Sequence, residues 1–341
     1  MTGRGGRRAV STVVDVSLAL MLVSASVVTL TFFMTGTERT HDPRLADQTA
    51  DTLAGVTVTT EYDLEPITDP IQDDPGRDDP FDDDPYGPSD YERTKHGPIL
   101  SQLADATVIE ARFPDGDDST LLDPSADPER LTRSGVDYRK SLQGTIRNAL
   151  TDADQSAHVV ALWRPYEGSA IEGRVEVGQT PPAGGDYSTS TITLSSDMPP
   201  LRDSEVERAF RRGGIPDVAD LVARSIIRGY FPPGETQLAL ERNGFERDLV
   251  VYRYQRMAEV LDARSNFDDT TPAVTGRNYL SQTQANAREL NSDLETDLSL
   301  LIEEDLRELR DDEYGGSFEA ETLADVVRPG DVTITVYTWN E

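Results

Sequence analysis

The sequence contains no cysteine among its 341 residues. This absence excludes disulfides, thiolate metal sites, iron–sulfur clusters and acylation of a lipobox cysteine. Lysine is almost missing as well: Lys95 and Lys140 are the only two, and the other basic residues are arginines. Beyond the first few residues no basic stripe occurs. We therefore expect no nucleic acid among the partners.

Motifs of the common enzyme classes are also missing. The sequence has no G-x-S-x-G, G-x-G-x-x-G, Walker loop, H-E-x-x-H or S-x-x-K arrangement. The three histidines, His41, His96 and His158, do not have metal-ligand spacing. Carboxylates are too numerous for any one acid–base pair to stand out. We expect no catalytic residue, no metal site and no cofactor, and thus a protein that is not an enzyme. An envelope hydrolase of unrecognised type is the least favoured alternative.

The charge is strongly one-sided, with 63 acidic against 32 basic residues and a formal net charge of −31. Such an acidic, lysine-poor surface resembles those of proteins from extreme halophiles, in which molar salt shortens the Debye length to about 3 Å. The functional alternative is an acidic chain that binds cations or basic partners. Because the acidity is spread along the whole length, we favour the halophilic interpretation.

One long apolar run follows a short basic leader. Residues 1–9 contain Arg4, Arg7 and Arg8, and residues 10–34 are apolar apart from Asp15 and scattered Ser and Thr. At about 1.5 Å per residue, a helix of this length crosses a hydrocarbon core of about 30 Å. The positive-inside rule places the N-terminus in the cytoplasm and the rest outside. The expected location is the cell membrane, with a single pass, an extracellular domain and contact with membrane lipid.

The residues at the start of this run carry a resemblance. Arg7, Arg8, Ala9 and Val10 resemble the class III leader of archaeal type IV pilins, in which basic residues and a small residue precede an apolar helix. The resemblance implies that a prepilin peptidase cuts after Ala9 and leaves the helix attached, and that other pilin-like subunits are partners. Two alternatives stay open: an uncleaved signal anchor, and a secretory signal peptide cleaved near residues 24–26.

Asp15 is the charged residue inside the apolar run. A carboxylate at the centre of a membrane helix costs about 2.5–3.5 kcal/mol and usually has a function. By resemblance to bacterial pilins, Asp15 would meet the terminal amine of a neighbouring subunit during assembly, although it is shifted by one position from theirs. The alternative is a carboxylate that reaches the cytoplasmic headgroups, near the favourable N-terminal end of the helix dipole.

A second resemblance spans the whole chain. Ser11 to Val16, Trp163 to Tyr166 and Thr338–Trp339 are similar to motifs of an uncharacterised haloarchaeal family of single-pass membrane proteins. The Trp163-Arg164-Pro165-Tyr166 stretch is a possible recognition loop, since Arg164 is flanked by the aromatic rings of Trp163 and Tyr166. The alternative is the end of a strand whose two rings cover the core.

The residues after the apolar run divide into three parts. Residues 35–65 form a stem, with a short helix at 45–53 and a strand at 56–62. Residues 66–93 repeat Asp-Asp-Pro units, so we expect a solvated acidic linker. Residues 94–341 form an extracellular α+β domain.

Within that domain, periodicity predicts the individual elements. Residues 99–106 form a helix that enters a strand at 108–113, and 159–163, 173–178 and 187–194 form an antiparallel meander. The remaining expectations are helices at 138–150, 203–212, 218–230, 249–261 and 279–310, and a closing strand at 332–336. The predicted fold class is therefore α+β: an N-terminal transmembrane helix followed by a mixed, mainly antiparallel sheet with helices.

These observations favour a non-enzymatic, pilin-like envelope protein. It would be a minor or accessory component of an archaeal type IV pilus-like apparatus. The alternative is a surface binding module that is tethered by an uncleaved signal anchor and belongs to no pilus.

Overall fold

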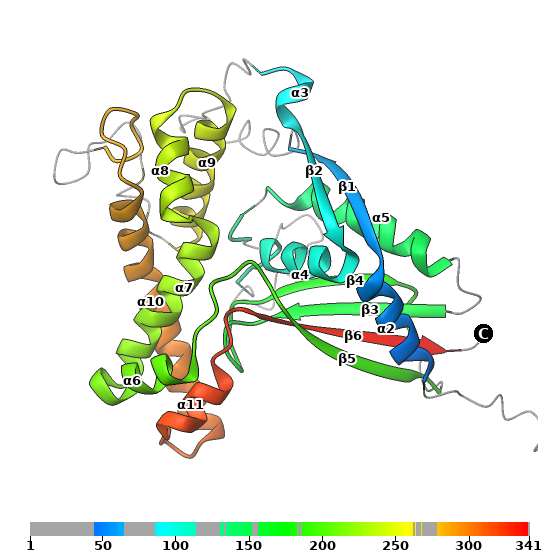
Figure 1. The fold of residues 1–341 in the computed structure, drawn as a ribbon. Coiled ribbons are helices and arrows are strands. Elements are labelled where there is room, and N and C mark those ends of the chain that lie inside the picture. Colours follow the sequence, from blue (N-terminus) through cyan, green and yellow to red (C-terminus); the bar gives the residue numbers. More distant parts are fainter. Residues whose placement is uncertain are drawn as a thin grey trace, which may run out of the picture.

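The computed structural model describes residues 44–64, 86–113, 130–132, 134–151, 156–182, 184, 186–261, 263, 267 and 278–339. Its elements in chain order are α2 (Leu45–Gly55), β1 (Thr57–Asp63), α3 (Pro88–Tyr91), β2 (Glu92–Pro98), α4 (Ile99–Ile109), α5 (Val136–Thr151), β3 (Ser156–Trp163), β4 (Gly173–Gly178), β5 (Ser188–Ser195), α6 (Asp203–Gly213), α7 (Ile215–Tyr230), α8 (Pro233–Glu241), α9 (Phe245–Val260), α10 (Ala287–Glu313), α11 (Ala320–Val326) and β6 (Asp331–Trp339). Figure 1 shows a sheet region with α2, α4 and α5, beside a helical region that contains α6 to α10.

The fold class requires a correction. We predicted an α+β fold led by a transmembrane helix, and this is wrong as stated: within the described ranges, no helix is long and apolar enough to cross a membrane. The longest of them, α10, is rich in Asp and Glu. The described chain is α+β with two antiparallel sheets. The predicted span, residues 10–34, lies outside the described residues.

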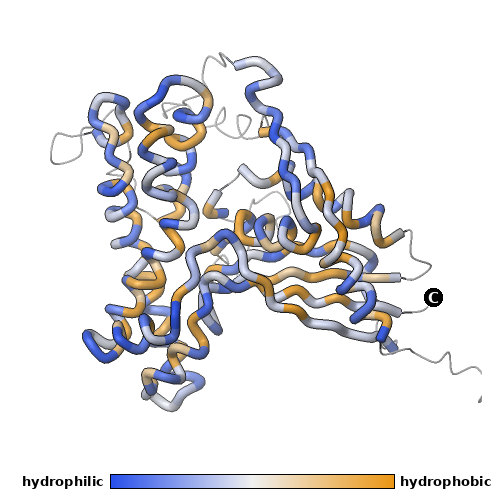
Figure 2. The backbone as a smooth tube through the Cα atoms, in the orientation of Figure 1, coloured by the Kyte–Doolittle hydropathy of each residue, from blue (hydrophilic) through white to orange (hydrophobic). Residues whose placement is uncertain are grey.

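The larger sheet has four antiparallel strands in the order β4-β3-β6-β5. The last strand of the chain is therefore inserted between β3 and β5, and not at an edge. Alternate residues of β6 point into the core, so that Val332, Ile334 and Val336 are fully buried. Their register partners on β3 include Val159 and Ala161, which are fully buried as well. This period-two pattern creates one apolar face, which packs against α4 (Figure 2).

The smaller sheet pairs β1 with β2. Residues 45–63, which we assigned to a stem, form α2 and β1 in the structure. Ala50 and Leu53 of α2 are buried in the main core, and β1 pairs along its whole length with β2 from Thr57↔Pro98 to Asp63↔Glu92. Of the predicted linker, residues 66–85 lie outside the described residues, whereas Pro88–Tyr91 form α3.

The helical region is organised around α7 and α10, which pack closely along their lengths. Both helices have a buried apolar stripe at helical spacing; on α10 it includes Leu290, Leu294, Leu298, Ile302 and Leu306. Their opposite faces are charged, which is typical of an amphipathic helix at a protein surface. The helix predicted for residues 279–310 is thus confirmed from Ala287 onward, with its buried leucines in the core, whereas Leu301 is 38% exposed.

Lys95 on β2 forms an ion pair with Asp105 of α4. Its Nζ lies 2.5 Å from a carboxylate oxygen of Asp105 on α4 and 3.6 Å from one of Asp197. The Asp105 side chain is only 12% exposed, and burial raises its pKa above the ordinary value. A charge in such a place is stable only while its partner remains.

We predict that Lys95→Met lowers the free energy of unfolding by about 1–3 kcal/mol at neutral pH, because Asp105 is left unpaired. The loss should shrink as the pH falls through the raised pKa of Asp105 and the carboxyl becomes neutral. Urea unfolding at two pH values measures both effects. Lys140→Met is the matched control, since Lys140, the other lysine, is exposed. Equal effects of the two variants would contradict this role for the pair.

Candidate functional site

The residues that the sequence marked for processing and assembly cannot be placed. Arg7, Arg8, Ala9, Val10 and Asp15 all lie outside the described residues. Their roles in leader cleavage and in helix assembly stay predictions.

The predicted recognition loop is described, and two of its three side chains point inward. Trp163 is fully buried, and its Nε1 donates to the Pro329 carbonyl at 2.8 Å. Tyr166 is 1% exposed and donates its hydroxyl to Asp305 at 2.7 Å. Only Arg164 is exposed, and it pairs with Glu172 at 2.8 Å. The two rings therefore contribute to the core, as the alternative interpretation expected, and a recognition role stays a prediction.

A cavity of about 650 Å³ lies elsewhere, between the helical region and the end of the small sheet. Three parts of the chain form it: α3 with the start of β2, the C-terminal end of α7 with α8, and the first half of α9. Its lining residues are Ser89, Asp90, Arg93, Tyr230, Phe231, Pro232, Glu235, Thr236, Leu238, Ala239, Arg242, Asn243, Phe245, Glu246, Val250 and Arg253. Its volume falls within the range of about 300–1,000 Å³ that is typical of small-molecule sites.

Arg253 is the central charged group of this cavity. It extends from α9, where its neighbours Tyr252 and Tyr254 are both buried. Its guanidinium carbon lies 5.7 Å from the centre of the Phe231 ring, and its Nη2 donates to the Tyr230 carbonyl at 3.4 Å. The Nε atom is buried and has no hydrogen-bond acceptor.

No carboxylate of the described residues forms an ion pair with Arg253. Burial lowers the pKa of its guanidinium from the ordinary value, because the charged form has lost hydration. In a chain with a net charge of −31, leaving an arginine unpaired in a cavity is unusual. Arg253 is half-buried, and a partly dehydrated charge without a counter-ion is stabilised when an anion joins it.

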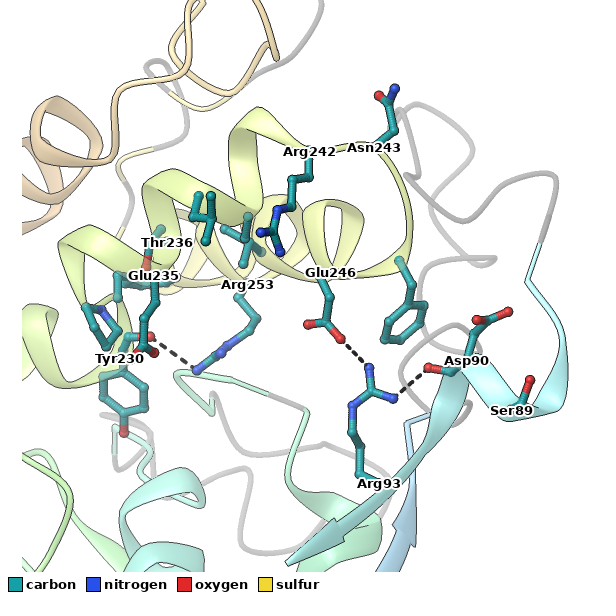
Figure 3. A pocket seen from close by; sticks show the side chains of 16 residues that line it. Ser89, Asp90, Arg93, Tyr230, Glu235, Thr236, Arg242, Asn243, Glu246 and Arg253 are labelled. Atoms are coloured by element: carbon teal, nitrogen blue, oxygen red, sulfur yellow. Dashed lines mark hydrogen bonds and ion pairs between the residues drawn. The ribbon is translucent and has the colours of Figure 1, made fainter.

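The other charges of the cavity are arranged around this group (Figure 3). Arg93 is bound at 2.6 Å to Glu246, donates to the Asp90 carbonyl at 2.7 Å and lies over the Phe245 ring. Arg242 is exposed, and its side chain points toward the cavity from the side opposite Arg93. The cavity thus contains the Arg93–Glu246 ion pair, the carboxylates of Asp90 and Glu235, and two arginines, Arg242 and Arg253, that form no ion pair with the described carboxylates.

This cavity was not predicted from the sequence. Its residues come from 89–93 and 230–253, two segments without a common motif, and α8 was not predicted at all. One signal was present: Arg253 interrupts the apolar pattern of a helix whose neighbouring positions are buried, and a charge at such a position requires a partner. Among the described residues, no cluster of three or more His, Cys, Asp or Glu side chains has metal-binding geometry.

Fold and cavity together define an acidic α+β protein with an arginine-containing pocket beside its helical region. Residues 14–339 match the family described as "Family of unknown function (DUF7284)", and the chain belongs to this family. No curated protein and no solved structure matches the chain.

Proposed function

We propose that the described domain is a non-enzymatic binding module that holds a small organic anion in the Arg253 cavity. The unpaired guanidinium of Arg253 is the observation that carries the proposal. A carboxylate or phosphate in the cavity would supply the missing counter-charge for this side chain, and charge-assisted hydrogen bonds of this kind are the strong ones.

The surroundings of Arg253 favour a ligand with an apolar part. Phe231, Leu238 and Val250 line the cavity, and Leu238 is 48% exposed. The Phe231 ring, already covered on one side by the guanidinium, is stacked on Tyr254 with centroids 3.9 Å apart. This wall is rigid and apolar, whereas Arg242 and Arg253 provide the positive charge. An aromatic or aliphatic carboxylate fits this combination better than an inorganic ion does.

This proposal is independent of how the chain is anchored. The pilin-like role and the tethered surface module both depend on residues 7–15, which lie outside the described residues. Both stay predictions, and both are compatible with a ligand-binding domain.

The test uses benzoate as a probe and benzamide, its neutral isostere, as the matched ligand. We expect benzoate to stabilise the protein against thermal unfolding, by about 2.7 kcal/mol at one hundred times its Kd. Benzamide should have no effect. Arg253→Gln should remove the response to benzoate. Since the variant also removes an unpaired desolvated charge, its own stability without ligand should be equal to or above that of the unaltered protein.

Arg211→Gln is the control, because Arg211 is an exposed arginine on α6 that pairs with Glu207. It should keep the full response to benzoate. The proposal fails if benzoate and benzamide act alike, or if Arg253→Gln still responds. The measurements belong at constant ionic strength, because chloride competes for the same guanidinium.

A further inference from the structure

The two edges of the four-stranded sheet differ in chemistry. β4, at one edge, carries Arg174 and Glu176, and Gln143 of α5 donates to the Glu176 carbonyl at 2.8 Å. β5, at the other edge, is the outermost strand in Figure 1, and no described strand pairs with its outer side. An edge strand presents unpaired backbone donors and acceptors, which proteins normally protect with charges, proline or a covering element.

β5 has none of the usual chemical protection. Residues 187–196 read Tyr-Ser-Thr-Ser-Thr-Ile-Thr-Leu-Ser-Ser, without charge, proline or glycine, in a chain of which 28% is charged. On the solvent side of the sheet, Thr189, Thr191 and Thr193 are all exposed. The row of threonines extends to the neighbouring strand β6, because the Oγ1 atoms of Thr191 and Thr335 lie 3.4 Å apart.

We propose that β5 is a self-association edge, at which a second copy of this chain adds its own β5 antiparallel and extends the sheet across a two-fold axis. The threonines are symmetric about Thr191. A two-fold axis perpendicular to the sheet and midway between the two copies of Thr191 places Thr191 opposite its own copy and Thr189 opposite Thr193. β-branched residues in direct cross-strand pairs stabilise a sheet.

The distribution of charge favours a second copy as the occupant. Two chains of net charge −31 repel each other over most of their surfaces, but the uncharged strand brings no like charges face to face. The flanking acids are also offset in this register: Asp186 meets position 196, a serine.

The absence of cysteine makes a direct test possible in the full-length chain. We expect Thr191→Cys to form a disulfide-linked dimer under mild oxidation, because directly opposite Cα atoms in an antiparallel pair lie about 4.5–5.5 Å apart, within disulfide range. A mixture of the Thr189→Cys and Thr193→Cys chains should cross-link more than either chain alone. Non-reducing gel electrophoresis reads out both results, and a reductant should reverse them.

Thr333→Cys is the control, since Thr333 is exposed on the same face of the sheet but belongs to the inner strand β6. It should remain monomeric on the gel. The proposal is overturned if no β5 position cross-links, or if Thr333→Cys cross-links as well as Thr191→Cys, which would show random collision. A cross-link only in the Thr189→Cys chain alone would also overturn it, because Thr189, and not Thr191, would then lie opposite its own copy.

Discussion

Ending the chain at Gly330 is expected to prevent the domain from folding. The deletion removes β6, which lies between β3 and β5 and provides the hydrogen-bonding partner of each. Val332, Ile334 and Val336 would be lost from the core, each fully buried and each contributing about 1.5–3 kcal/mol. Domains of this kind have a total stability of only about 5–15 kcal/mol. The lost burial alone is therefore comparable to the whole stability, before any lost strand pairing is considered.

Far-ultraviolet circular dichroism and proteolysis would measure this outcome. The truncated chain should show no cooperative unfolding transition and should be digested rapidly. A chain that ends at Trp339 retains all of β6 and is the control, with expected unfolding like that of the full chain. If the chain ending at Gly330 still unfolds cooperatively, β5 must pair directly with β3, and the described strand order does not determine stability.

Local periodicity predicted many of the individual elements, because side-chain patterns are local properties, but it missed α3, β2, α8 and α11. The strand expected at 332–336 forms the centre of β6, and that at 173–178 coincides with β4, paired with β3 as expected. Gly214 separates α6 from α7, and Pro216 lies in the first turn of α7, where a proline is tolerated. Helix α2 includes the helix predicted at 45–53 and ends at Gly55.

The order of the strands was predicted less well, because it depends on long-range pairing that no local pattern records. The expected meander over 159–194 is wrong in its last step: β5 pairs with β6, and not with β4. The strand expected at 108–113 is also wrong. Residues up to Ile109 continue α4, and Arg112 forms only isolated bridges. The second error arises because β-branched residues suit either a buried helix or a strand.

The candidate site was beyond prediction for a similar reason. Arg93 and Arg253 are 160 positions apart in the sequence and meet only through the packing of α9 beside β2. The sequence drew attention to Trp163 and Tyr166 instead, because aromatic rings beside an arginine are typical of recognition loops. The sequence does not show in which direction these side chains point, because their direction depends on which face of β3 packs against the core.

Trp163→Ala is the point substitution with the largest expected effect on stability. The indole is fully buried at the end of β3, so its removal should cost about 3–5 kcal/mol through lost burial and the cavity left behind. Its Nε1 also satisfies the carbonyl of Pro329, in the turn that leads into β6. Urea unfolding, monitored by circular dichroism, should show a large decrease in the midpoint with an unchanged slope.

Two further variants separate this structural role from recognition. Trp163→Phe keeps an aromatic ring but leaves the Pro329 carbonyl without its donor, so we expect a loss of about 1–3 kcal/mol. Arg164→Gln changes the adjacent exposed residue, whose surface pair with Glu172 should be worth less than about 1 kcal/mol. A recognition loop would give the opposite pattern, with stability unaffected by Trp163→Phe. Because the indole both fills the core and donates to the turn before β6, its loss should weaken the same strand on which the whole sheet depends.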